Sequence, residues 1–184
     1  MKPLPPHPVL RAGDYVLRPL TMADAPDWYE WLSEYDVSDA ISYDVRSVSD
    51  VRRIVAWYLE RRSAGDAHRW MIRGADDGPV GTVGFNVWDT ASDRAEIGYD
   101  LRPSHWGRGI MTAACRAVLA FAFEQGVNRA EAIVLTPNER SSRVLSRLGF
   151  RSEGILREYR RVRGAYRDAE MFSLLRREWQ AEGA

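Results

Sequence analysis

The residues best suited to binding chemistry form one short stretch, Arg-Pro-Ser-His-Trp-Gly-Arg-Gly at positions 102–109. A strand-like run, residues 95–101, precedes the stretch, and a helix-like run, residues 110–125, follows it at once. The first N–H groups of a helix have no intrahelical partner and carry partial positive charge, and glycine lets a ligand approach the backbone. This arrangement predicts a phosphate-binding turn, although ordinary turns between a strand and a helix also contain such glycines.

The turn matches neither of two common nucleotide-binding motifs. It does not end in Gly-Lys-Ser/Thr, which a P-loop requires, and Thr112 stands where a dinucleotide fingerprint has its third glycine. The turn alone therefore predicts a phosphate-bearing ligand without identifying it.

The composition is that of one globular domain. The chain has 184 residues, of which 45% are hydrophobic and 28% charged, and its formal net charge is zero, so the charge balance does not support binding to nucleic acid or to an anionic membrane. Cys115 is the single cysteine, which excludes an internal disulfide, and we find neither a signal peptide nor a membrane span. We expect a cytoplasmic protein with a short Pro-rich leader over residues 1–12 and a single domain over residues 13–184.

Periodicity and turn residues predict the elements that position the turn. Helices are expected from Thr21, from Ser47 or Ser49, and over residues 110–125 and 138–148. The expected strands cover residues 15–20, 68–74, 80–88, 94–101, 129–135, 150–159 and 167–175. This order, β-α-α-βββ-α-β-α-ββ, predicts an α/β fold with a mixed sheet of about seven strands and helices on its faces.

Motifs spread over most of the chain resemble those of the Gcn5-related N-acetyltransferases, and more closely their RimJ/RimL-type branch, which acetylates ribosomal-protein N-termini. They occur in that family's order and spacing. The matching pieces are Tyr15-Val-Leu-Arg-Pro-Leu, Ala95-Glu-Ile-Gly-Tyr, Trp106-Gly-Arg-Gly-Ile-Met-Thr, Pro137-Asn-Glu-Arg-Ser, Leu148-Gly-Phe and Glu153-Gly-Ile-Leu.

The resemblance implies that the protein binds acetyl-CoA and transfers its acetyl group to an amine. The turn would hold the pyrophosphate, and the strand end at Leu101 and Arg102 would pair with the pantetheine arm as an added strand. Asn138 would contact the pantetheine, cap a helix, or do both. The implied cofactor contacts are Leu101, Arg102, Trp106, Gly107, Arg108, Gly109, Ile110, Met111, Thr112, Asn138 and Ser141.

The resemblance also yields catalytic candidates. Glu96 stands where family members often carry a general base; the alternative is a glutamate on a solvated strand face. Ser141 matches a serine proposed to act near the thiol, or is a polar residue in a first helical turn. The glutamate expected with it is replaced by Arg160, and Glu158 is the substitute that keeps the same strand face. A second departure is Leu145, where many members carry a tyrosine that protonates the leaving thiolate.

The identity of the acceptor is left open by the sequence. Candidate acceptor contacts are Trp28, Trp31 and Tyr159, although the two tryptophans also suit a core. One wall carries the acids Asp27, Glu30, Glu34, Asp36 and Asp39, and the other the bases Arg160, Arg161 and Arg163. We expect a protein N-terminal amine; the alternatives are a small amine or a non-catalytic acyl-CoA-binding module. No metal-ligand spacing is present, and a homodimer is possible.

Overall fold

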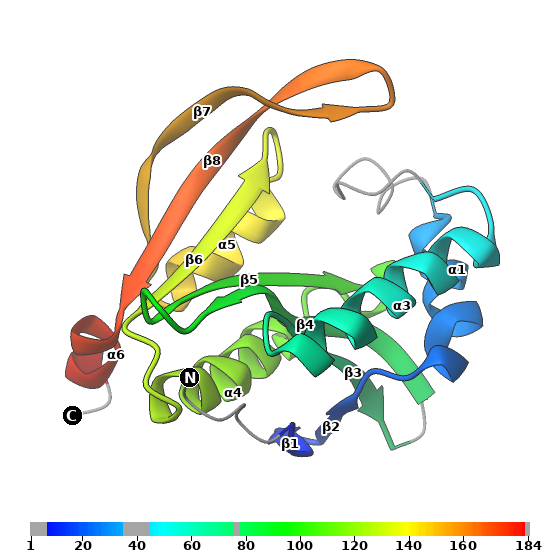
Figure 1. Cartoon of the computed structure of the whole chain (residues 1–184), viewed down its shortest axis with the longest axis horizontal. Coiled ribbons are helices and arrows are strands. Elements are labelled where there is room, and N and C mark those ends of the chain that lie inside the picture. The colour runs from blue at the N-terminus through cyan, green and yellow to red at the C-terminus, as the bar shows by residue number, and fades with distance from the viewer. Residues whose placement is uncertain (1–6, 35–44, 76–77, 183–184) are drawn as a thin grey trace.

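A computed structural model describes residues 7–34, 45–75 and 78–182 of the protein (Figure 1). Its centre is an eight-stranded sheet in the order β1-β2-β3-β4-β5-β6-β8-β7. The strands are β1 (Leu10–Ala12), β2 (Tyr15–Pro19), β3 (His68–Gly74), β4 (Gly78–Asp89), β5 (Arg94–Leu101), β6 (Arg129–Leu135), β7 (Arg151–Val162) and β8 (Ala165–Leu175). The helices are η1 (Met22–Asp24), α1 (Ala25–Leu32), α3 (Val48–Ala64), η2 (Pro103–His105), α4 (Ile110–Glu124), α5 (Glu139–Arg147) and α6 (Arg176–Glu182).

The predicted mixed α/β sheet is confirmed, with one strand more than the sequence indicated. The additional strand is β1, which lies in the segment that the sequence analysis assigns to the leader. It pairs antiparallel with β2, with Leu10 opposite Leu17. Three residues are too few to show a period-2 pattern, so its pairing becomes visible only in the fold.

The helices cover the two faces of the sheet (Figure 1). Trp70 and Ile72 of β3 pack in one hydrophobic cluster with residues of α4, whereas Met71 between them packs with residues of α1 and α3. This is the alternation expected of a strand buried on both faces. The cluster around α4 supports the start of that helix, where the glycine-rich turn ends.

The sheet divides between β5 and β6, the one parallel pair among the described strands. These strands are paired only from Arg94 opposite Arg129 to Glu96 opposite Glu131, and then they diverge (Figure 1). Beyond that point β5 stays with β4, and β6 stays with β8. The diverging strands form a wedge, and residues of both strands line a hollow within it.

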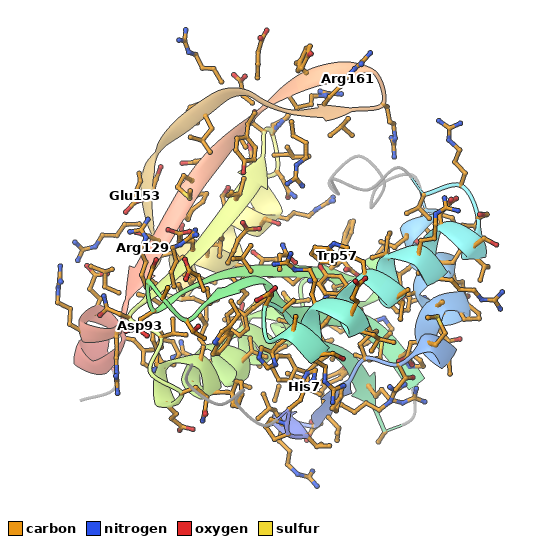
Figure 2. All side chains as sticks on the ribbon, in the orientation of Figure 1. His7, Trp57, Asp93, Arg129, Glu153 and Arg161 are labelled. Atoms are coloured by element: carbon orange, nitrogen blue, oxygen red, sulfur yellow. The ribbon has the colours of Figure 1, made fainter. Side chains whose placement is uncertain are left out.

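A cluster of ion pairs lies at the closed end of this wedge. Glu131 accepts hydrogen bonds from Arg94 (2.7 Å) and Arg129 (2.6 Å), and Arg129 also binds both carboxylate oxygens of Glu153 on β7 (2.9 and 2.5 Å; Figure 2). Hydrogen bonds from Arg129 and Ser173 lower the pKa of Glu153 to about 2. The cluster connects β5, β6, β8 and β7 where the two halves of the sheet meet.

His68, at the start of β3, makes folding depend on pH. Its ring is 2% exposed among Trp70, Trp88 and Phe121, and neither ring nitrogen has a hydrogen-bond partner in the described part of the chain. Burial, aided by the nearby charge of Arg62, lowers the pKa of His68 to about 4. Below its ordinary pKa near 6.5 the unfolded chain binds a proton that the folded protein excludes.

We therefore expect the free energy of unfolding to fall as the pH drops from about 6.5 to about 4, by about 2 to 3 kcal/mol from this one residue. His68→Phe should weaken this dependence while keeping an aromatic ring in the cluster. Urea denaturation of both proteins at about pH 7.5 and about pH 5 measures it. Equal losses of stability between the two pH values in wild type and variant would contradict the assignment.

Candidate active site

The predicted phosphate-binding turn has the backbone conformation that its glycines allow. Gly107 and Gly109 lie in the left-handed region, at φ 76° and 75°, and Gly109 is the N-cap of α4. The first hydrogen bond of the helix runs from the N–H of Ala113 to the carbonyl of Gly109. The N–H groups of Ile110, Met111 and Thr112 therefore have no intrahelical partner and point out of the helix start, as anion binding requires.

A hollow of about 410 Å³ opens over this turn. The turn and the start of α4 form one wall, α5 forms the other, and the end of β5 contributes Tyr99, Asp100 and Leu101. The predicted cofactor contacts that line it are Leu101, Trp106, Gly107, Gly109, Ile110, Met111, Thr112, Asn138 and Ser141.

Two predicted cofactor contacts lie elsewhere. The guanidinium of Arg102 forms an ion pair with Glu30 on α1, and the N–H of Arg102 donates to the carbonyl of Val80 (2.8 Å). Arg108 is exposed and does not line the hollow. Arg102 is thus engaged by its neighbours, and its contact with the cofactor stays a prediction.

The hollow also contains residues that the sequence analysis did not single out. Arg140, Arg143 and Arg147 line it from α5, and Arg140 lies over the Trp106 ring at 4.0 Å. Their spacing of three and four residues places them on one helix face. That periodicity, next to a phosphate-binding turn, is the signal that could have identified them.

A second hollow lies in the wedge between β5 and β6. It shares Tyr99, Asp100, Asn138 and Ser141 with the first, so the two meet at the divergence of the strands. Its other lining residues include the charged and amide side chains of Arg69, Asn86, Glu96 and Arg160, and the rest are Gly98 and apolar residues of β5 and β6. The structure thus brings Glu96 and Ser141, from opposite halves of the sheet, to the same opening.

Glu96 is held in place by a bulge in β4. The β4–β5 register shifts between Phe85 and Val87, and Asn86 at this irregularity donates from Nδ2 to Glu96 Oε1 (3.0 Å). Asn86 Oδ1 in turn accepts a hydrogen bond from the hydroxyl of Tyr58 on α3 (2.6 Å). This chain fixes the carboxylate of Glu96 at the hollow while leaving its second oxygen available to a ligand.

Ser141 and its neighbours border both hollows. Asn138 caps α5, because its Oδ1 accepts a hydrogen bond from the N–H of Ser141 (3.2 Å). Asn138 also lines both hollows, so the helix cap and a ligand contact can be made by the same residue. The hydroxyl of Tyr99 donates to the Ser141 carbonyl (3.2 Å), and burial raises the pKa of Tyr99 well above its ordinary value. Tyr99 is therefore a protonated phenol at neutral pH.

The single cysteine of the chain is buried. Cys115 on α4 is fully enclosed in the core, and this burial raises the pKa of its thiol. A protonated, inaccessible thiol cannot act as a nucleophile. Leu145, where a tyrosine was expected by resemblance, is likewise a buried core residue.

Trp28 and Trp31 do not form an acceptor wall. Both are 0% exposed, and their indole N–H groups donate to Asp100 Oδ1 (3.0 and 2.8 Å). The other oxygen of Asp100 accepts from Arg69 (2.9 Å) and Thr82 (2.7 Å). The sequence could not separate the two roles, because aromatic residues at helical spacing suit a core face and a ligand wall equally well.

Glu158 and Tyr159 line neither of the two hollows, although Arg160 lines the second. The β7–β8 register shifts between Leu156 and Arg160, and Glu158 has a φ of 50°. Because this bulge interrupts the alternation of side chains, the two-residue spacing no longer places Glu158 on the face of Arg160. Both Glu158 and Tyr159 are exposed in the structure.

The acids expected on one wall of the acceptor site lie only partly within the residues that the structure describes. Glu30 is engaged by Arg102, and Asp27 and Glu34 are exposed. Asp36 and Asp39 lie outside the described residues. The described acids therefore form no continuous lining of the second hollow.

Comparison with known proteins identifies this architecture. The family model of the acetyltransferase (GNAT) domain matches residues 14–151. The chain belongs to the GNAT acetyltransferase family. It is 35% identical over 166 residues to the uncharacterized N-acetyltransferase p20 of Bacillus licheniformis, covering 89% of this chain and 93% of that one.

Two further relatives lie in the RimJ/RimL-type branch. The ribosomal-protein-serine acetyltransferase of Escherichia coli is 32% identical over 130 residues, 70% of this chain and 72% of its own. The structure of Mycobacterium smegmatis RimJ in complex with CoA-disulfide superimposes with a TM-score of 0.80 at 29% identity, covering 96% of this chain and 93% of that one.

The GNAT protein described here is thus an acetyl-CoA-dependent N-acetyltransferase. Among its described residues, no helix is long and apolar enough to cross a membrane. Within the same residues, no cluster of three or more His, Cys, Asp or Glu side chains could hold a metal ion.

The buried Asp100 provides a test of what supports the site. Trp31→Phe keeps an aromatic ring but removes one donor to the carboxylate, and we expect it to lower the free energy of unfolding by about 2 kcal/mol. Trp57→Phe is the matched control, because Trp57 lies on α3 with 43% of its surface exposed; its effect should stay within about 0.5 kcal/mol. Chemical denaturation of both variants measures the difference, and equal effects would argue against the Asp100 network.

Proposed function

We propose that the protein acetylates the N-terminal amine of a protein acceptor, with acetyl-CoA in the first hollow and the acceptor amine in the second. The observation that carries this proposal is the junction of the two hollows at Tyr99, Asp100, Asn138 and Ser141. A thioester entering from one side and an amine entering from the other would meet there. Transfer in one step requires the two to be held in contact.

The residues of the first hollow fit the chemistry of acetyl-CoA. The unpaired N–H groups at the start of α4 suit the pyrophosphate, and Arg140, Arg143 and Arg147 supply positive charge on the opposite wall. Since the N–H of Arg102 bonds to β4, alternation turns the N–H groups of Tyr99 and Leu101 toward the wedge. These groups can pair with the amides of the pantetheine arm or donate to the thioester oxygen.

Glu96 is the general base in this proposal. The amine nitrogen forms a bond to the acetyl carbon, the carbon–sulfur bond breaks, and the amine gives up a proton. Glu96 takes that proton directly or through water, while the hydrogen bond from Asn86 keeps the carboxylate oriented. The departing thiolate needs little assistance, because a thiol has a pKa of about 8.5.

The relatives support a protein acceptor. The Escherichia coli relative is a ribosomal-protein-serine acetyltransferase, and a second relative from that organism, 29% identical over 102 residues, acetylates an alanine of ribosomal protein uS5. Both relatives act on a ribosomal protein. An acceptor of the same kind is proposed for this chain, and small amines are the alternative that the assay must include.

The test is Glu96→Gln, which keeps the hydrogen-bonding shape of the side chain but removes its basicity. We expect kcat for peptide acetylation, followed by thiol release, to fall about 10²- to 10⁴-fold. Acetyl-CoA affinity measured by calorimetry should be unchanged. Glu124→Gln, an exposed carboxylate at the end of α4, is the matched control and should retain full activity.

Two outcomes would count against this account. Full activity of Glu96→Gln would remove Glu96 from the mechanism. Turnover of small amines but of no peptide, by the wild-type protein, would replace the protein acceptor with a small one.

A further inference from the structure

We propose that the acceptor hollow selects an amine that carries a negative charge a few bonds from the reacting nitrogen, and that Arg160 binds this charge. The inference rests on the proposed function and specifies the substrate class for the same site. It is drawn from the charges that line the second hollow, which is hereafter called the acceptor hollow.

Four acidic or basic side chains line the acceptor hollow, and two of them form an ion pair with each other. Arg69 and Asp100 form an ion pair at 2.9 Å, with 2% and 3% of their side chains exposed. Arg69 also donates to the carbonyl of Gly98 (2.9 Å), and Asp100 accepts three other hydrogen bonds. A pair so fully engaged belongs to the wall and offers little to a ligand.

The other two groups are Glu96 and Arg160, which carry opposite charges. Glu96 comes from β5 and is held by Asn86, whereas Arg160 comes from β7 in the other half of the sheet. Arg160 lies over the ring of Tyr159 at 5.8 Å and forms no ion pair with a carboxylate of the described residues. Its guanidinium, exposed on the hollow, is available to a ligand.

This separation of charge matches one class of acceptor. An amine bound at Glu96 with an anionic group directed toward Arg160 would satisfy both groups at once. A guanidinium binds carboxylate and phosphate through two parallel hydrogen bonds, so both anions fit. An amine flanked by a cation instead would place like charges together in the hollow. A nearby positive charge also favours the neutral, nucleophilic form of the amine.

The surroundings of Arg160 strengthen the field. The β7–β8 hairpin projects from the sheet, with Arg161 near its tip (Figure 2). Arg157, Arg161 and Arg167 of this hairpin are exposed, on a chain whose formal net charge is zero. A basic hairpin beside the hollow attracts anionic acceptors and raises their rate of encounter.

The experiment compares acceptors that differ only in charge. The peptides are Ser-Glu-Ala-Ala, Ser-Gln-Ala-Ala and Ser-Lys-Ala-Ala; the small amines are O-phosphoethanolamine and ethanolamine. In each series that the wild-type protein acetylates, we expect kcat/KM for the anionic acceptor to be at least about tenfold higher than for the uncharged or cationic acceptors. Whether the protein acetylates the peptides, the small amines or both shows which kind of acceptor carries the anionic group.

Variants assign the preference to Arg160. Arg160→Gln should remove the advantage of the glutamate peptide while leaving the lysine peptide unchanged or improved, and Arg160→Glu should reverse the order. Arg151→Gln, an exposed arginine at the start of the same strand that lines neither hollow, is the matched control and should keep the preference. Unchanged acetyl-CoA affinity by calorimetry shows that each variant is folded.

The outcomes separate this inference from the proposed function. Acetylation with equal kcat/KM for anionic and neutral acceptors, or a charge preference that survives Arg160→Glu, would overturn the inference and leave the acetyltransferase site standing. Absence of turnover with every acceptor would overturn both.

Discussion

The site depends on the separation of two parallel strands. β5 and β6 pair over three residues and then diverge, so the sheet is continuous at one end and open at the other. Backbone groups of an interior strand normally bond to both neighbours, and those at the end of β5 that face the opening have no β6 strand beside them. The opening is thus both a passage through the sheet and an edge ready to pair with an extended ligand.

Two groups of charged residues keep this geometry fixed. The ion pairs of Arg94, Arg129, Glu131 and Glu153 hold the halves together at the closed end. At the open end, Asp100 connects β5 to β3, β4 and α1 through four hydrogen bonds to buried side chains. A fully hydrogen-bonded buried carboxylate admits few alternative arrangements, so it determines where the last residues of β5 lie. Leu101 and the glycine-rich turn follow directly.

Local sequence signals predicted much of this architecture. The strand periodicity, the glycines of the turn, and the position of Glu96 on β5 depend on neighbours within a few residues. What escaped prediction depends on contacts between distant segments. Asn86 acquires its position from a bulge in β4 that its local sequence does not predict. Trp28 and Trp31 lie in a core, where their indole N–H groups donate hydrogen bonds to Asp100, about seventy residues away in the sequence.

Two further differences show how single local rules fail. The alternation rule placed Glu158 on the same face as Arg160, but a bulge with a positive φ at Glu158 lies between them and shifts the register. The strand end at Leu101 and Arg102 was expected to pair with the pantetheine arm, yet the N–H of Arg102 bonds to Val80 of β4 and its guanidinium pairs with Glu30. In both cases a local rule could not show the bulge or the tertiary contact that sets where the residue lies.

We propose that the open edge of β5 pairs with acetyl-CoA, and residue-resolved amide hydrogen exchange by NMR, with and without saturating acetyl-CoA, measures this pairing. We expect the amides of Tyr99 and Leu101 to exchange rapidly in the free protein and to become strongly protected when acetyl-CoA binds, with little change at Val55 on α3. Binding that protects the start of α4 but leaves Tyr99 and Leu101 unaffected would contradict it.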